Sequence, residues 1–327
     1  MSYTEGESIP RWFAWLGMII ALLIPYVMAV VVVTPPTTMT SAIKELGFDI
    51  SGLSIALISI PYISVIVIIV AYLWYHNDYW YRDVEHTVLN PIVLALIIGY
   101  PIAFALTANS SMGVYFVGAL LIAIIVAMFY KWEPRIPTSV GYKIGLFWAG
   151  VTAVVVLLVS SLDILISNGF SAWLSALLSP TWYQHVIIYS YASWLINQFH
   201  ITNTLQLIPT IGLMAFIVGF SEEAWARLSI PMVGKYLDNL TLSVWWLGTT
   251  WLSLHAVVIA VEVGLSAVPI NLLILSIIAI PIFYVFAKTG DYIATAIMHG
   301  FYDLMVSLGF IGLILAVALI IVFARYH

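Results

Sequence analysis

The chain has 327 residues, of which 63% are hydrophobic and only 8% are charged, and its formal net charge is -5. Because an ordinary soluble domain carries about 25% charged residues, this composition excludes a water-soluble globular protein and a nucleic-acid binder with a basic face. Cysteine is absent, which excludes disulfides and thiolate metal sites. We expect an all-α fold, a polytopic transmembrane helical bundle.

Apolar runs of about 20 residues indicate the spans. They predict helices at about 12–34, 51–74, 89–107, 112–130, 144–167, 205–229, 241–263, 268–287, 291–308 and 311–324. One helix over 291–324 would be about 50 Å long against a bilayer core of roughly 30 Å, so we expect a break near Gly309. The helix at 205–229 is expected to end before Pro231. Residues 168–203 are expected to form an outer loop with an interfacial helix, because they are rich in Trp and Tyr. About 8–10 spans result.

Positive charges predict the orientation of the bundle. With this arrangement of spans, most of the basic residues lie on the side of the N-terminus: Arg11, Arg82, Lys131, Arg135, Lys143, Lys235 and Lys288. The opposite side holds only Lys44. Since Lys and Arg are enriched in cytoplasmic loops, we expect a multi-pass integral membrane protein with a cytoplasmic N-terminus.

Two adjacent acids lie near the cytoplasmic end of the helix at 205–229. Neighbouring residues on a helix point about 100° apart, so Glu222 and Glu223 cannot face one site equally. Glu223 and Arg227 are four residues apart and are expected to form an ion pair. Glu222 is then left to project into a cavity. The competing structural interpretation is a salt-bridge cluster at the membrane edge.

Two later helices add histidines at a similar depth. His255 lies in the middle of the helix at 241–263, and His299 shares a helix face with Asp303. Each alone is typical of a hydrogen-bonded core residue. Together with Glu222 they predict one polar cluster in the inner half of the bilayer, where ionisable residues usually mark function. A carboxylate can deprotonate water there, and histidines can donate to an oxyanion or bind a metal.

These residues resemble three motifs of a known family. Glu222-Glu223-x-x-x-Arg227, Trp251-x-x-x-His255 and His299-x-x-x-Asp303 are similar to the motifs of the CPBP family. That family contains the type II CAAX prenyl endopeptidases and bacteriocin-processing relatives with the ABI domain. Trp251 stands where the family has Phe, and Asp303 stands where the prenyl endopeptidases have Asn. The chain therefore divides into N-terminal helices without a matching motif at 1–203 and a CPBP-like protease core at 204–327.

The resemblance implies a role for each motif residue. Glu222 would activate a water molecule, His255 would help to hold it, and His299 and Asp303 would polarise the scissile carbonyl or share the water site. Glu223 and Arg227 would support the helix end. Two chemistries stay open. In the first, Glu222, His255 and His299 bind zinc. In the second, Glu222 acts as a base without a metal, and the position of Glu222 favours this second chemistry.

The implied function is that of an intramembrane endopeptidase acting near the cytoplasmic half of the bilayer. Its partners would be membrane lipid and a membrane-bound or lipidated peptide substrate, with no role for nucleic acid. Two alternatives remain. One is a catalytically inactive relative that serves as a scaffold or subunit of a membrane complex. The other is an ion- or proton-coupled transporter, in which buried acids and histidines relay protons.

Overall fold

A computed structural model describes residues 87–95, 97–98, 134–179, 204–238, 240–262, 264 and 268–327. Throughout these ranges the ordered elements are helices and there is no strand, which confirms the all-α expectation. The helices predicted at about 12–34, 51–74 and 112–130 lie outside the described residues. Of the helix predicted at 89–107, residues 91–95 and 97–98 are described, and they are helical.

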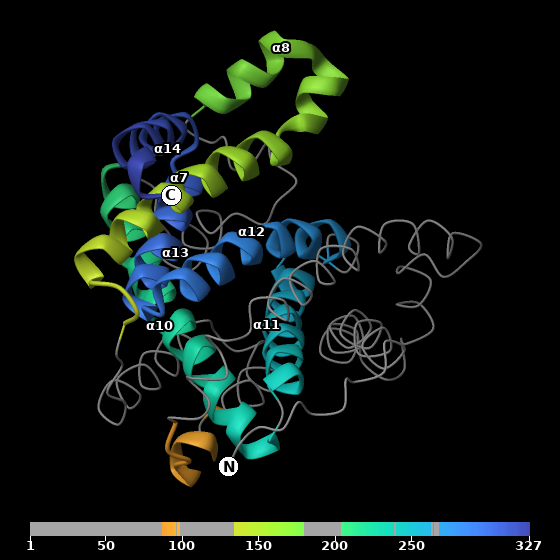
Figure 1. Cartoon of the computed structure of the whole chain (residues 1–327). Coiled ribbons are helices and arrows are strands. Elements are labelled where there is room, and N and C mark those ends of the chain that lie inside the picture. Colours follow the sequence, from red (N-terminus) through yellow and green to blue (C-terminus); the bar gives the residue numbers. More distant parts are fainter. Residues whose placement is uncertain are drawn as a thin grey trace, which may run out of the picture.

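Four helices of the described part pack around one central helix, α13 (Tyr292–Ser307; Figure 1). In chain order, the helices with described bounds are α7 (Thr138–Ser160), α8 (Leu162–Leu178), α10 (Thr204–Leu237), α11 (Leu240–Glu262), α12 (Val268–Thr289), α13 (Tyr292–Ser307) and α14 (Gly309–Phe323), followed by a 3-10 turn, Ala324–Tyr326. The short helix α13 packs against α7, α10, α12 and α14. Helix α11 packs against α10 and α12. Side chains on α13 therefore lie inside the bundle.

The predicted break near Gly309 is confirmed. The N–H of Leu308 donates to the carbonyls of Leu304 and Met305, both at 3.1 Å, and closes the last turn of α13. Gly309 then has a φ of 56°, in the left-handed region that glycine adopts without a steric cost. The chain can therefore turn sharply between α13 and α14.

The bounds predicted for the helix at about 144–167 are wrong. Helix α7 begins at Thr138 and ends at Ser160, and α8 occupies part of the predicted outer loop. At the break, the Ser161 hydroxyl donates to the Leu157 carbonyl at 2.7 Å and accepts from the Trp173 indole at 2.7 Å. These side-chain bonds stabilise the break because serine competes with the backbone for its hydrogen bonds.

The predicted helix end before Pro231 is also wrong. Helix α10 contains both Pro209 and Pro231 and continues to Leu237. A proline inside a helix removes a backbone hydrogen bond and costs about 3 kcal/mol. Ile230 and Met232, on either side of Pro231, are both completely buried. Burial of this continuous helix face offsets the cost, because tertiary packing supplies most of the stability of a helix.

Two helices in the described part are long and apolar enough to cross a membrane. They are α7 and the segment Gly309–Tyr326, which comprises α14 and the turn after it. Large apolar side chains cover the outer face of α14: Ile311, Ile314, Leu315, Val317, Ile321 and Val322 are all exposed. Such a large exposed apolar surface is characteristic of a helix in contact with lipid.

Small residues allow α10 and α13 to approach each other closely. A Cβ atom on Gly219 of α10 would lie 2.7 Å from the backbone nitrogen of Gly300 and 2.8 Å from the carbonyl oxygen of Ala296, both on α13. Small residues at helix contacts are the usual means of close packing in membrane proteins. Gly219 lies one helical turn before Glu223, and Gly300 directly follows His299, so this contact sets the separation of the two helices at the ionisable residues.

We therefore expect Gly219→Ala to lower the free energy of unfolding by about 1–3 kcal/mol, because an added methyl group overpacks this contact. The matched control is Gly248→Ala on α11, where no described atom lies within 4 Å of the added Cβ. There alanine should be neutral or stabilising through its helix propensity. Thermal unfolding in detergent measures both variants, and equal effects would contradict the close contact.

Candidate active site

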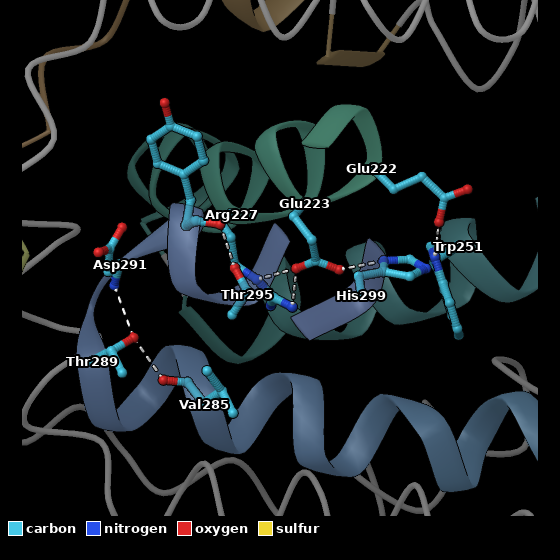
Figure 2. Close-up of polar contacts among 10 residues, drawn as sticks. Glu222, Glu223, Arg227, Trp251, Val285, Thr289, Asp291, Thr295 and His299 are labelled. Carbon is cyan, nitrogen blue, oxygen red and sulfur yellow. Dashed lines mark hydrogen bonds and ion pairs between the residues drawn. The ribbon is translucent and has the colours of Figure 1, made fainter. Parts of the chain in front are cut away.

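Three helices supply the candidate residues. Helix α10 carries Glu222, Glu223 and Arg227, α11 carries Trp251 and His255, and α13 carries His299 and Asp303. Figure 2 shows the side chains of α10 and α13 in a row that ends at Trp251. Helices α10 and α13 run antiparallel, since Gly219 faces Gly300 while Gly212 faces Leu304.

A hydrogen-bonded turn fixes the start of α13 (Figure 2). The Thr289 hydroxyl donates to the Val285 carbonyl at 2.7 Å and accepts from the N–H of Asp291 at 3.1 Å. The Asp291 carboxylate then accepts from the N–H of Ile293 at 2.9 Å and caps the helix. Gly290 between them has a φ of 62°. This turn determines which face of α13 points toward α10.

Glu223 is the centre of a buried ionic network. Its Oε2 lies 2.7 Å from one terminal guanidinium nitrogen of Arg227 and accepts from the Arg227 Nε at 2.9 Å. Its Oε1 accepts from the Nδ1 of His299 at 3.0 Å. The Arg227 guanidinium also lies 4.7 Å from the ring centre of Phe283 and 4.9 Å from that of Phe286. The predicted ion pair of Glu223 and Arg227 is confirmed.

His299 faces a carboxylate at each ring nitrogen. Its Nε2 lies 3.6 Å from Oδ2 of Asp303, one helical turn along α13, so the predicted shared face is confirmed. Since Nδ1 contacts a carboxylate, which only accepts, Nδ1 carries a proton. A separation of 3.6 Å is too long for a hydrogen bond, so a proton on Nε2 can be donated to a third group.

Glu222 contacts a different helix from Glu223, so the predicted divergence of the two adjacent acids is confirmed, and the cavity predicted for Glu222 stays a prediction. Its Oε2 accepts from the indole N–H of Trp251 on α11 at 3.1 Å, and only 6% of the residue is exposed. Figure 2 shows this contact beyond the imidazole of His299. Glu222 is therefore a buried acid beside the ionic network.

His255 joins the site through the same tryptophan. The ring centres of His255 and Trp251 are 4.4 Å apart, and the Nδ1 of His255 lies 2.8 Å from the Trp251 carbonyl oxygen. A carbonyl can only accept, so Nδ1 is the donor and the neutral ring presents Nε2 as an acceptor. Trp251 therefore contacts both Glu222 and His255.

Two contacts of the site were not predicted from the sequence. Trp251 was considered only as an aromatic replacement for Phe, although its indole N–H is a donor that Phe lacks. The tryptophan at this position was the signal from which the hydrogen bond to Glu222 could have been predicted. Glu223 was assigned to Arg227 alone, but it also holds His299. No local signal could have shown this second contact, because it joins residues on separate helices.

The zinc site that the sequence left open stays a prediction. Nowhere in the described ranges do three or more His, Asp or Glu side chains form a metal-binding group. A histidine binds metal through a lone pair on a ring nitrogen. The Nδ1 of His299 contacts Glu223, whereas its Nε2 lies 3.6 Å from Asp303 and makes no hydrogen bond to it. The reaction proposed below follows the alternative without metal, which the position of Glu222 favours.

Comparison of the chain with protein-family models, with curated proteins and with solved structures finds no match. The assignment of function therefore depends on the residues of the three motifs and on the contacts they make.

Proposed function

We propose that this chain is a polytopic membrane protein of about 8–10 spans with a cytoplasmic N-terminus, and that it is an intramembrane endopeptidase of the CPBP type. It would hydrolyse a peptide bond of a membrane-bound or lipidated peptide near the cytoplasmic half of the bilayer. One observation carries the proposal: a buried carboxylate, Glu222, is held by Trp251 on the side of the buried imidazole of His299 (Figure 2). The motif resemblance supports the same assignment.

In the proposed reaction Glu222 acts as the general base. It takes a proton from a water molecule whose oxygen attacks the carbonyl carbon of the scissile bond, while the Nε2 of His255 accepts the second hydrogen of that water. The Nε2–H of His299 donates to the oxyanion that forms. Glu222 then returns its proton to the leaving nitrogen as the carbon–nitrogen bond breaks. Glu223 and Arg227 act by holding His299 in place.

The proposal requires no metal, so we expect cleavage to continue in the presence of 1,10-phenanthroline or EDTA. The physical reason is that Glu222 activates the water as a general base and His299 donates to the oxyanion, and neither role needs a metal. The measurement is the rate of peptide cleavage by the purified full chain after dialysis against the chelator. Loss of activity that zinc alone restores would contradict this chemistry and favour the zinc alternative.

A scaffold function is the second candidate, and one observation favours it. The network of Arg227, Glu223 and His299 is internally paired and joins α10 to α13 without any substrate. Such a network can hold two helices in register, which is sufficient for a subunit of a membrane complex. A transporter is the third candidate, since acids and imidazoles in adjacent helices can relay protons.

One reconstitution experiment tests these proposals. The full chain is placed in liposomes with fluorescent peptides that carry, or lack, a C-terminal prenyl group. The endopeptidase proposal predicts release of a fluorescent fragment at a defined bond, without a proton or ion flux across the vesicle. Flux without cleavage would favour the transporter. Absence of both activities, for peptides of either kind, would contradict the endopeptidase and favour the scaffold.

Trp251→Phe should lower kcat roughly 10- to 100-fold and leave KM nearly unchanged. The variant keeps an aromatic ring beside His255 but loses the donor to Glu222, and a hydrogen bond to a charged group contributes about 1.5–3 kcal/mol. Steady-state cleavage kinetics measure the effect. The control is Trp246→Phe on the same helix, whose ring packs on Trp225. If both variants lost the same activity, general packing would explain the result.

A further inference from the structure

Basic residues of the described part gather at one end of the bundle. They lie before or near the start of α7 and near the ends of α10, α12 and α14: Arg135, Lys143, Lys235, Lys288 and Arg325. In the described helices, the opposite end carries no Lys or Arg. We call these five residues the basic rim, and α7, which carries Lys143, packs on α12, α13 and α14.

Two cations of this rim share a single phenol ring. The Nζ of Lys143 donates to the hydroxyl oxygen of Tyr326 at 3.4 Å and lies 4.9 Å from the centre of its ring. The guanidinium carbon of Arg325 is also 4.9 Å from the centre of that ring. Within the described ranges, no carboxylate forms an ion pair with Lys143 or Arg325. Since each cation lies 4.9 Å from the centre of the same ring, an anion bound beside Tyr326 would be attracted by both.

The position of these cations indicates where the anion would come from. Arg325 and Tyr326 directly follow α14, whose outer face exposes apolar side chains up to Ile321 and Val322. Aromatic rings accompany them, since Phe147 of α7 stacks on His327 with ring centres 5.2 Å apart. Basic and aromatic residues at the end of an apolar span lie at the depth of the lipid headgroups.

We propose that Lys143, Arg325 and the Tyr326 hydroxyl bind the phosphate of an anionic phospholipid where α7 meets α14. The two cations supply charge from adjacent helices. The tyrosine oxygen accepts from Lys143, and its own proton is left to donate to a phosphate oxygen. The acyl chains then lie along the exposed apolar face of α14. None of these three residues takes part in the proposed chemistry, and the lipid site does not depend on it.

The experiment titrates the purified full chain in detergent with phosphatidylglycerol or with phosphatidylcholine, and native mass spectrometry counts the bound lipids. The wild-type chain should prefer phosphatidylglycerol. The double variant Lys143→Gln/Arg325→Gln should weaken that binding at least about fivefold, because it removes both charges. The matched control Lys235→Gln removes one charge from the same rim at the end of α10 and should bind like the wild type.

Three results would overturn the proposal: equal binding of both lipids by the wild type, unchanged binding by the double variant, or displacement of phosphatidylglycerol by inorganic phosphate at the same concentration. The last result would indicate a simple anion site without a lipid. Should the double variant fail to fold, Arg325→Gln alone decides the matter, because Arg325 is exposed and its loss should still reduce binding.

Discussion

Glu222→Gln should abolish peptide cleavage and leave the helical bundle intact. Glutamine has the shape of glutamate, and its amide oxygen can still accept from the Trp251 indole that now lies 3.1 Å from Oε2. It cannot take a proton from water. A positioned general base contributes about 10²- to 10⁴-fold to a rate, so we expect a loss of at least about 100-fold. The rate of fragment release in liposomes measures the loss, and circular dichroism and thermal unfolding verify the fold.

Two further variants sharpen this test. Asp238→Asn makes the same acid-to-amide change at an exposed position after α10 and should leave cleavage unchanged. Glu222→Asp keeps the acid but withdraws it by one methylene group, so part of the activity should remain. If the Glu222→Gln variant cleaved the peptide at the wild-type rate, Glu222 could not be the base. The scaffold alternative instead predicts that this substitution leaves binding to partner proteins unaffected.

Arg227→Ala should lower the free energy of unfolding by about 3–5 kcal/mol, because it removes one partner of a buried ion pair. Glu223 would lose the guanidinium that now lies 2.7 Å from its Oε2, and only 3% of Glu223 is exposed to water. The rings of Phe283 and Phe286 would also lose the cation packed on them. Thermal or denaturant unfolding in detergent measures the effect. The control is Lys235→Ala, an exposed cation on the same helix, which should change stability little.

A double variant separates the ion pair from general packing. Glu223→Gln/Arg227→Met removes both charges and keeps similar volumes, and replacing a whole buried pair is far less costly than breaking it. We expect the double variant to be more stable than Arg227→Ala. If the losses of the single variants simply added in the double variant, Glu223 and Arg227 would not be coupled, and the network would not hold α10 to α13.

Much of this architecture could be predicted from the order of residues, because it depends on local rules. Apolar runs predicted α11, α12 and α13 to within a few residues, and the length of the last run required the break that Gly309 provides. Spacing of four residues predicted the contacts of Glu223 with Arg227 and of His299 with Asp303. Both pairs lie within one helix, where the geometry of the backbone alone brings the side chains together.

The contacts between helices could not be predicted from these local rules. The pairing of His299 with Glu223, and the bond from Trp251 to Glu222, depend on how α10, α11 and α13 are rotated and displaced along their axes. Close packing of Gly219 on Gly300 sets that relation for α10 and α13, and the continuation of α10 through Pro231 is also a consequence of packing. The period of one helix shows which residues share its face, but not which residues of another helix that face meets.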